Sequence, residues 1–333
     1  MKRLLQFAFV IFLLLPAHAF SQKLIEYVSM NSPIAVAVNP VTNMVYAANY
    51  NNGTVSVVDG STNETVTTIT VGPMPFSLAV NPVTNLIYVS NTGSAQGTGM
   101  SIMAIDGNSN TVVATLPLKV YPGFIAVNPI TNMVYFTVDY AGLHIAVMDA
   151  SDNRLVDEIH IQGSGCCQEG MALNSVTNRL YLAVDTFTDG SYIAVIDTSK
   201  NQLSGKFTPP GLKFAEALAV DTGLNRLYAS DNVYEEMFVI DGTDNKVIAT
   251  VPQYAESIAV NETTHVLAIA DLELTFIDGL TDQVVGGEVG YPDCSCRINL
   301  GAGIDNHFYV GYDNYINLSA TGALGVYSGP PSE

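Results

Sequence analysis

The octapeptide from Asn39 to Tyr46, NPVTNMVY, occurs three times in nearly the same form. Its close copies are NPVTNLIY at residues 81–88 and NPITNMVY at residues 128–135. Weaker copies of the same segment stand at residues 174–181, 221–228, 261–268 and 306–309. The tyrosine position recurs every 40 to 47 residues, a period that suits a unit of four strands. Seven copies therefore predict seven repeats of one small β-sheet.

The second repeat shows the strands of one unit most clearly. Its apolar runs, at residues 76–80, 86–90, 100–105 and 111–116, are separated by segments rich in Asn-Pro and Asp-Gly pairs. Such pairs mark turns, because glycine accepts a positive φ and proline is excluded from the middle of a sheet. Four antiparallel strands joined by tight turns form one blade of a propeller. The predicted fold is an all-β, seven-bladed β-propeller with four-stranded antiparallel blades.

The first strand of each repeat carries a small residue at one position, as an innermost strand crowded between neighbouring blades requires. These residues are Ala37, Ala79, Ala126, Ala172, Ala219 and Ala259. The last repeat stops one strand short, whereas residues 23–30 match the outer strand at residues 65–71. We therefore expect an N-terminal strand to complete the last blade and protect its edge.

These repeats resemble the YVTN family of β-propeller repeats, which is found in secreted and surface-layer proteins of prokaryotes. The resemblance rests on the Asn-Pro-x-Thr-Asn-x-Val/Ile-Tyr segment, on Val55 to Gly60, and on the Val-Gly-x-x-Pro segment at residues 71–75. It implies the propeller fold, but not one function, because propellers serve as binding scaffolds, enzymes and adhesion modules alike. The later repeats depart from the pattern through Asp221, Glu262 and Ala268.

The first nineteen residues have the features of a signal peptide. Lys2 and Arg3 precede an apolar run at residues 4–15, and Ala17-His18-Ala19 offers a small-residue cleavage site. The run is too short to span a bilayer stably. We therefore expect residues 20–333 to form a single propeller domain, a monomer without a membrane span. We expect it to be secreted or to lie in the periplasm or at the cell surface.

The chain is strongly acidic, with 31 acidic and 12 basic residues and a net charge of −19. This charge argues against a nucleic-acid partner, because phosphate binding needs a basic surface. It is compatible with a cationic ligand or a metal ion. It is equally compatible with a role in solubility alone.

The starts of the innermost strands carry the strongest candidate site. In a propeller, the connections that enter the innermost strands and those that join second to third strands lie around one mouth of the axial channel. Four consecutive repeats place a charged residue there: Glu169, Glu216, Glu256 and Arg297. The first three repeats have Ile34, Phe76 and Gly123 instead. Oxygen ligands that converge are what Ca²⁺ or Mg²⁺ requires, and packing gives a glutamate little reason to stand at this point.

Aspartate also ends the second strand in most repeats. The set is Asp139, Asp185, Asp231, Asp271 and Asp313, with Asn49 and Asn91 in the first two repeats. Because the residue recurs, we interpret the set mainly as turn caps whose side chains accept backbone hydrogen bonds. The histidines of the mature chain are His144, His160, His265 and His307. We assign them to different repeats and to structural roles.

Two cysteine pairs, Cys166-Cys167 and Cys294-x-Cys296, stand in long loops that enter the fourth and seventh repeats. In an exported protein four cysteines suggest two disulfides, for which three connectivities exist. The two loops belong to nearly opposite blades, while a disulfide needs Cα atoms within about 7 Å. Soft-metal binding by the thiolates is the alternative.

No nucleophile elbow, phosphate loop or His-Glu-x-x-His segment is present in the sequence. The leading hypothesis is therefore a non-catalytic scaffold that binds a protein, a polysaccharide or a small cationic ligand at the channel mouth. The alternative is a metal-assisted lactonase or lyase, in which Glu169, Glu216 and Glu256 are metal ligands or a base and Arg297 stabilises an oxyanion. A cell-surface adhesion module is the third hypothesis.

Overall fold

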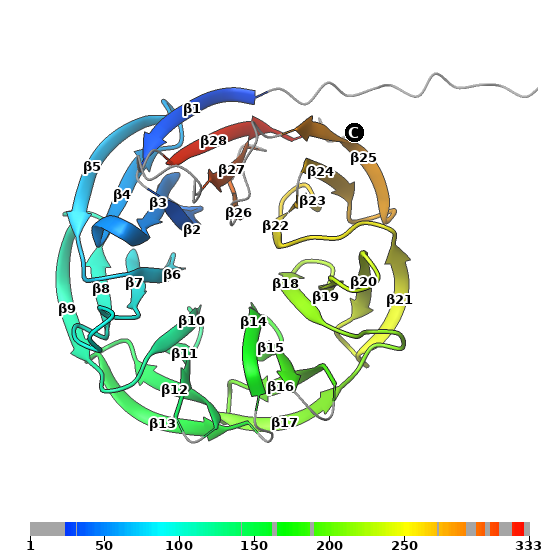
Figure 1. The fold of residues 1–333 in the computed structure, drawn as a ribbon, viewed down its shortest axis with the longest axis horizontal. Coiled ribbons are helices and arrows are strands. Elements are labelled where there is room, and N and C mark those ends of the chain that lie inside the picture. Colours follow the sequence, from blue (N-terminus) through cyan, green and yellow to red (C-terminus); the bar gives the residue numbers. More distant parts are fainter. Residues whose placement is uncertain are drawn as a thin grey trace, which may run out of the picture.

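The computed structural model describes residues 24–30, 32–140, 142–161, 165–186, 190–271, 273–290, 298–303, 307–312 and 322–329. These residues form seven four-stranded antiparallel sheets arranged around a common axis (Figure 1). The only regular helical turn among them is η1 (Tyr50–Asn52). No helix in the described part of the chain is long and apolar enough to cross a membrane.

Each blade runs outward from an innermost strand beside the axis. The innermost strands are β2 (Pro33–Asn39), β6 (Pro75–Asn81), β10 (Pro122–Asn128), β14 (Gly165–Asn174), β18 (Ala215–Asp221), β22 (Ser257–Asn261) and β26 (Ile298–Ala302). The second strands are β3 (Met44–Asn49), β7 (Leu86–Asn91), β11 (Met133–Asp139), β15 (Arg179–Thr186), β19 (Arg226–Asp231), β23 (Val266–Ala270) and β27 (His307–Tyr312). Neighbouring innermost strands pack on one another around the whole ring, including β2 on β26.

The outer half of each blade holds the remaining two strands. The third strands are β4 (Thr54–Asp59), β8 (Ser101–Asp106), β12 (Leu143–Asp149), β16 (Tyr192–Asp197), β20 (Glu236–Asp241), β24 (Glu273–Asp278) and β28 (Gly322–Ser328). The outermost strands are β5 (Glu64–Thr70), β9 (Thr111–Pro117), β13 (Arg154–His160), β17 (Gln202–Phe207), β21 (Lys246–Val251), β25 (Gln283–Gly290) and β1 (Leu24–Met30).

Blade seven is completed by the N-terminal strand, as expected. Strand β1 pairs with β28 in the order β1-β28-β27-β26 (Figure 1). Val28 and Met30 of β1 are buried against Val45 of blade one and Leu324 and Val326 of β28. The first described strand therefore joins both ends of the ring.

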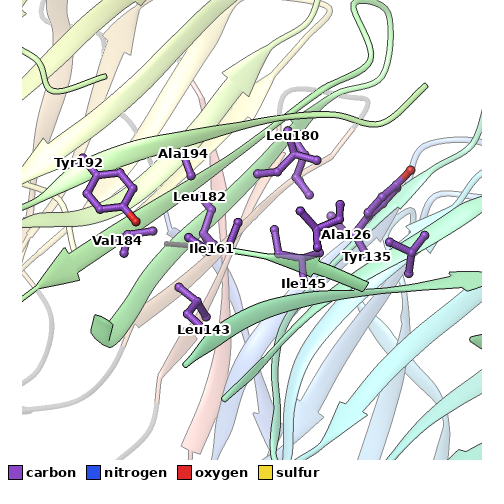
Figure 2. Close-up of a cluster of buried hydrophobic side chains, with 13 residues drawn as sticks. Ala126, Tyr135, Leu143, Ile145, Ile161, Leu180, Leu182, Val184, Tyr192 and Ala194 are labelled. Carbon is purple, nitrogen blue, oxygen red and sulfur yellow. The ribbon is translucent and has the colours of Figure 1, made fainter. Parts of the chain in front are cut away.

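The cores lie between blades and not inside one blade. Figure 2 shows the cluster between blades three and four, where Tyr135 and Ile145 meet Leu180 and Leu182. The repeat tyrosine stands opposite the small residue of the innermost strand, as in the pair Ala126 and Tyr135. Alanine there leaves room for the ring, which explains the small residue at that position.

Blade six lacks the repeat tyrosine and replaces its volume from the next strand. Ala259 stands opposite Ala268, and Ala268 stands opposite Phe276 of β24. Phe276 is fully buried, and its ring packs edge-to-face on that of Phe308 with centroids 5.2 Å apart. Phe276 therefore preserves the aromatic packing between blades six and seven although Ala268 replaces the tyrosine.

The face that carries the turns between first and second strands, and between third and fourth strands, is called the turn face here. In Asn39-Pro40-Val41-Thr42-Asn43, Asn39 Oδ1 accepts the backbone N–H groups of Val41 and Thr42, at 2.9 and 3.4 Å. Asn39 Nδ2 donates to Oδ1 of Asn85 in the next blade at 2.6 Å. Asn85 has a φ of 56°, a left-handed conformation that asparagine tolerates. The motif thus closes its own turn and links two blades.

The same link recurs around the turn face. Asn81 donates to Asn132, Asn128 to Asn178 and Asn174 to Asn225, at 3.0 to 3.1 Å. Between blades five and six, Asp221 replaces the first asparagine and His265 the second, and His265 Nδ1 lies 2.7 Å from Asp221 Oδ2. His265 keeps the left-handed φ, at 57°. The two departures from the repeat therefore compensate each other.

Candidate functional site

The opposite face, where connections enter the innermost strands and join second to third strands, is called the mouth face here. In blades one to three and five, the innermost strand has a β-bulge near its start. Ile34, Phe76, Gly123 and Glu216 lie within these bulges. A bulge leaves a residue outside the ladder and redirects its side chain, which frees this position to vary. These are the positions that the alignment of the repeats predicts at the channel mouth.

Blade five shows how the bulge beneath Glu216 is held. The bulged backbone N–H of Ala217 donates to Ser230 Oγ at 3.0 Å, and Ser230 Oγ donates to the Ala255 carbonyl at 2.6 Å. Ser230 is buried, so both bonds are shielded from water. Ala255 precedes Glu256, whose own N–H donates to the Ala270 carbonyl at 2.8 Å. One serine therefore fixes the backbones that carry Glu216 and Glu256.

The loop before Glu216 is fixed by a buried carboxylate. Asp231 ends β19 and accepts the backbone N–H groups of Lys213, Phe214 and Val233 at 2.6, 3.4 and 2.8 Å. Its exposed fraction is 0%. The interpretation of this aspartate as a cap is confirmed.

Other members of the end-of-strand set also make local hydrogen bonds. Asn49 donates to Thr54 Oγ1 and Ser56 Oγ, and Asn91 donates to Ser101 Oγ. Asp185 accepts from Ser191 Oγ, which also contacts the Lys213 carbonyl. Asp139 is exposed, and Asp313 lies outside the described residues. Asp271 differs from the rest, because it lies near the carboxylates of the mouth face.

The carboxylates of blades five and six surround Tyr254, which lies in the loop between β21 and β22. Burial raises the pKa of Tyr254 well above its ordinary value, and the charges of Glu216, Glu256 and Asp271 raise it further. The tyrosine hydroxyl therefore stays protonated beside the Glu216 carboxylate. Asn232 Nδ2 donates to Glu216 Oε2 at 2.6 Å. This donor is neutral, so it orients the Glu216 carboxylate without cancelling its charge.

We call Glu216, Tyr254, Glu256 and Asp271 the acidic mouth cluster. It brings together two of the three glutamates that the sequence selected. Glu169 lies in β14, but its side chain is outside the described part of the structure, and so is all of Arg297. The described residues contain no group of three or more His, Cys, Asp or Glu side chains that could hold a metal ion. The three-glutamate metal site and the enzyme based on it stay predictions.

The cysteine predictions also stay untested. Cys166 and Cys167 belong to β14, where Cys167 pairs with Asp185 through the backbone, but their side chains are outside the described residues. Cys294 and Cys296 lie outside those residues altogether.

Sequence reasoning missed Tyr254 of the acidic mouth cluster and Asn232, which donates to Glu216, and it placed two histidines wrongly. Tyr254 and Asn232 lie in connections whose lengths vary between repeats, so alignment gave them no equivalent. Tyr254 stands two residues before Glu256, and this is the one signal that would have selected it. His144 and His160 were assigned to different repeats, which is wrong: they are cross-strand neighbours in blade three.

Seven blades closed by a strand from the other end of the chain define a seven-bladed β-propeller. Neither protein-family models nor curated proteins match the sequence, so the resemblance to the YVTN family is unconfirmed. Among solved structures, a chain of hydrazine synthase from Kuenenia stuttgartiensis matches with a TM-score of 0.70 and 15% identity. The match covers 89% of this chain and 95% of that one.

The β-propeller domain of Cps50 (Swd1) from Myceliophteria thermophila matches with a TM-score of 0.72 and 10% identity. It covers 93% of this chain and 100% of that domain. At such identities the likeness shows the fold alone. Proteins as different as these two share it, so function must be argued from the site.

Proposed function

We propose that the chain is a non-catalytic binding protein that takes a positively charged ligand at the acidic mouth cluster. The proposal is carried by Glu216, a carboxylate at a bulge that is oriented by the neutral donor Asn232 and lies beside Tyr254. If Glu216 were paired with a buried cationic side chain, its charge would be neutralised within the fold. Here the nearby carboxylates of Glu256 and Asp271 add to it.

Like charges in proximity disfavour the unliganded state, and a cation relieves that repulsion. The same field draws cations from solution, because the whole chain carries a charge of −19. An organic ammonium group and the lysine of a basic peptide share this chemistry. The Tyr254 ring adds a surface over which an ammonium group gains cation–π attraction.

The setting of this function is part of the proposal. The leader-like residues 2–19 support export, so we propose that the ligand is met in the periplasm, at the cell surface or in the medium. Expression of the full chain followed by N-terminal sequencing of the exported protein tests this point. Recovery of the chain with residues 1–19 intact would contradict it.

Titration calorimetry with spermidine at low ionic strength tests the binding proposal. We expect spermidine to bind the wild type, and Glu216→Gln and Glu256→Gln to weaken that binding by at least tenfold. Glu64→Gln removes the same charge from an exposed position at the start of β5 and should leave affinity unchanged. No binding by the wild type, or equal weakening by Glu64→Gln, would overturn the proposal.

A further inference from the structure

Blade three carries four polar side chains side by side at its outer edge on the mouth face. His144 is the first residue of β12 that pairs with β13, and its partner is His160, the last residue of β13. The two rings have centroids 4.8 Å apart and planes tilted by 57°. Residues directly opposite in a ladder share one face of the sheet. The pair therefore stands together on the surface, because His160 is exposed.

Glu158 and Tyr140 fix the orientation of His144. Glu158 lies two residues before His160 on the same strand, and its Oε1 is 2.6 Å from His144 Nδ1. Tyr140 stacks on the His144 ring at 4.6 Å with planes 6° apart, and its hydroxyl donates to Glu158. A carboxylate accepts hydrogen bonds, so His144 donates through Nδ1 and keeps Nε2 as its coordinating nitrogen.

This arrangement matches what a metal-binding histidine needs. Ligating histidines commonly donate their second nitrogen to a carboxylate, which fixes the tautomer and raises the basicity of the ligand. An ion held about 2.1 Å from one nitrogen of each ring, with a tetrahedral or square angle, places the ring centroids about 5 Å apart. The observed 4.8 Å is within this range.

We propose that His144 and His160 form a surface site for a late first-row transition-metal dication, Cu²⁺ or Zn²⁺. Glu158 is a positioning residue that acts through His144. Imidazole selects these ions, whereas Ca²⁺ and Mg²⁺ prefer oxygen ligands. Copper binds more tightly than zinc to the same nitrogen ligands. The remaining coordination positions are open to water or to an exogenous ligand, because the protein supplies two.

The test is titration of the metal-free full chain with CuCl₂ near neutral pH, with the cysteines alkylated so that thiolates do not bind the ion. Electron paramagnetic resonance of the Cu²⁺ form should show coupling to nitrogen, and the titration should give one equivalent. We expect His144→Asn and His160→Asn each to weaken Cu²⁺ binding by at least tenfold. Glu158→Gln should weaken it by about tenfold, the usual cost of losing such a carboxylate.

Glu64→Gln is the matched control, because it removes an exposed carboxylate from blade one, away from both proposed sites, and it should leave Cu²⁺ affinity unchanged. The exposed position of His160 ensures that His160→Asn folds, which circular dichroism checks. The proposal is overturned if the wild type does not bind Cu²⁺, if His160→Asn binds it with unchanged affinity, or if no nitrogen coupling is seen.

Discussion

The two faces of the propeller differ in how closely their residues repeat from blade to blade. On the turn face the same asparagine link joins blades one to five. Between blades five and six both of its residues change together, to Asp221 and His265, and between blades six and seven Asn261 donates to the Gly303 carbonyl instead. On the mouth face, equivalent bulge positions hold side chains as different as Ile34, Phe76 and Glu216. The residues that repeat from blade to blade therefore lie on the turn face, which holds the ring together. The residues that differ between blades lie on the mouth face, which is free to acquire a ligand.

Gly60→Ala should have the largest effect of the substitutions considered, because it affects a crowded point of the turn face. A Cβ at Gly60 would lie 2.7 Å from the Asn43 carbonyl oxygen and 2.7 Å from the Tyr309 hydroxyl of blade seven. The glycine has no positive φ, so the cost is steric. We expect a loss of about 1–3 kcal/mol in the free energy of unfolding, as for other overpacked sites. Urea unfolding measures it.

Gly205→Ala in the outer strand β17 is the control for this substitution. A Cβ there would meet nothing within 4 Å. Alanine in a strand interior is favoured over glycine by roughly 0.5–1 kcal/mol, so this variant should be as stable as the wild type or more so. Equal unfolding midpoints for the two variants would show that the turn face is not tightly packed.

A double-mutant cycle at Asp221 and His265 should have an intermediate effect. Asp221 is fully buried, and its Oδ1 accepts the Leu224 N–H at 2.9 Å while Oδ2 faces His265. Asp221→Asn or His265→Asn alone replaces one partner of this link, whereas the double variant recreates the asparagine pair of the other blades. We expect a favourable coupling of about 0.5–3 kcal/mol, the usual range for residues in contact.

Unfolding midpoints of the four proteins, taken at a constant denaturant slope, give this coupling energy. If the double variant loses the sum of the two single losses, the Asp–His link is not equivalent to the asparagine links. The turn face would then tolerate change without compensation, and the contrast between the two faces would disappear.

The sequence repeat predicted the ring, because each copy of the Asn-Pro motif specifies the same turn and therefore the same register. It also located Glu216 and Glu256, because both stand at a position that can be aligned from repeat to repeat.

The pairing of His144 with His160 could not be predicted from the sequence, for a specific reason. An extra residue, Val156, stands in β13, and the register shifts between Val147 and Met148. Without that shift His144 would face Ile159, and His160 would lie on the other side of the sheet.

Tyr254 was beyond prediction for a different reason. It lies in a connection rather than in a strand, and the connections into the innermost strands differ in length from blade to blade. Its position beside Glu216 depends on how blade six packs on blade five, with Ser230 tying the two backbones together. Strand pairing repeats along the sequence, but contacts between neighbouring connections do not.

Glu216→Gln should have the smallest effect on stability and so gives the sharpest test of the mouth face. Glutamine keeps the hydrogen bond from Asn232 and removes one negative charge beside Glu256 and Asp271. We expect a change within about 0.5 kcal/mol, typical of a substitution that leaves no buried group unsatisfied. The change should be towards higher stability at low salt and should shrink at high salt, because screening weakens the repulsion between partly exposed carboxylates. A loss above about 2 kcal/mol, as when a hydrogen bond to a charged group is needed for folding, would make Glu216 structural. Its carboxylate would then serve the fold, as Asp231 does, and the mouth face would be governed by the same rule as the turn face.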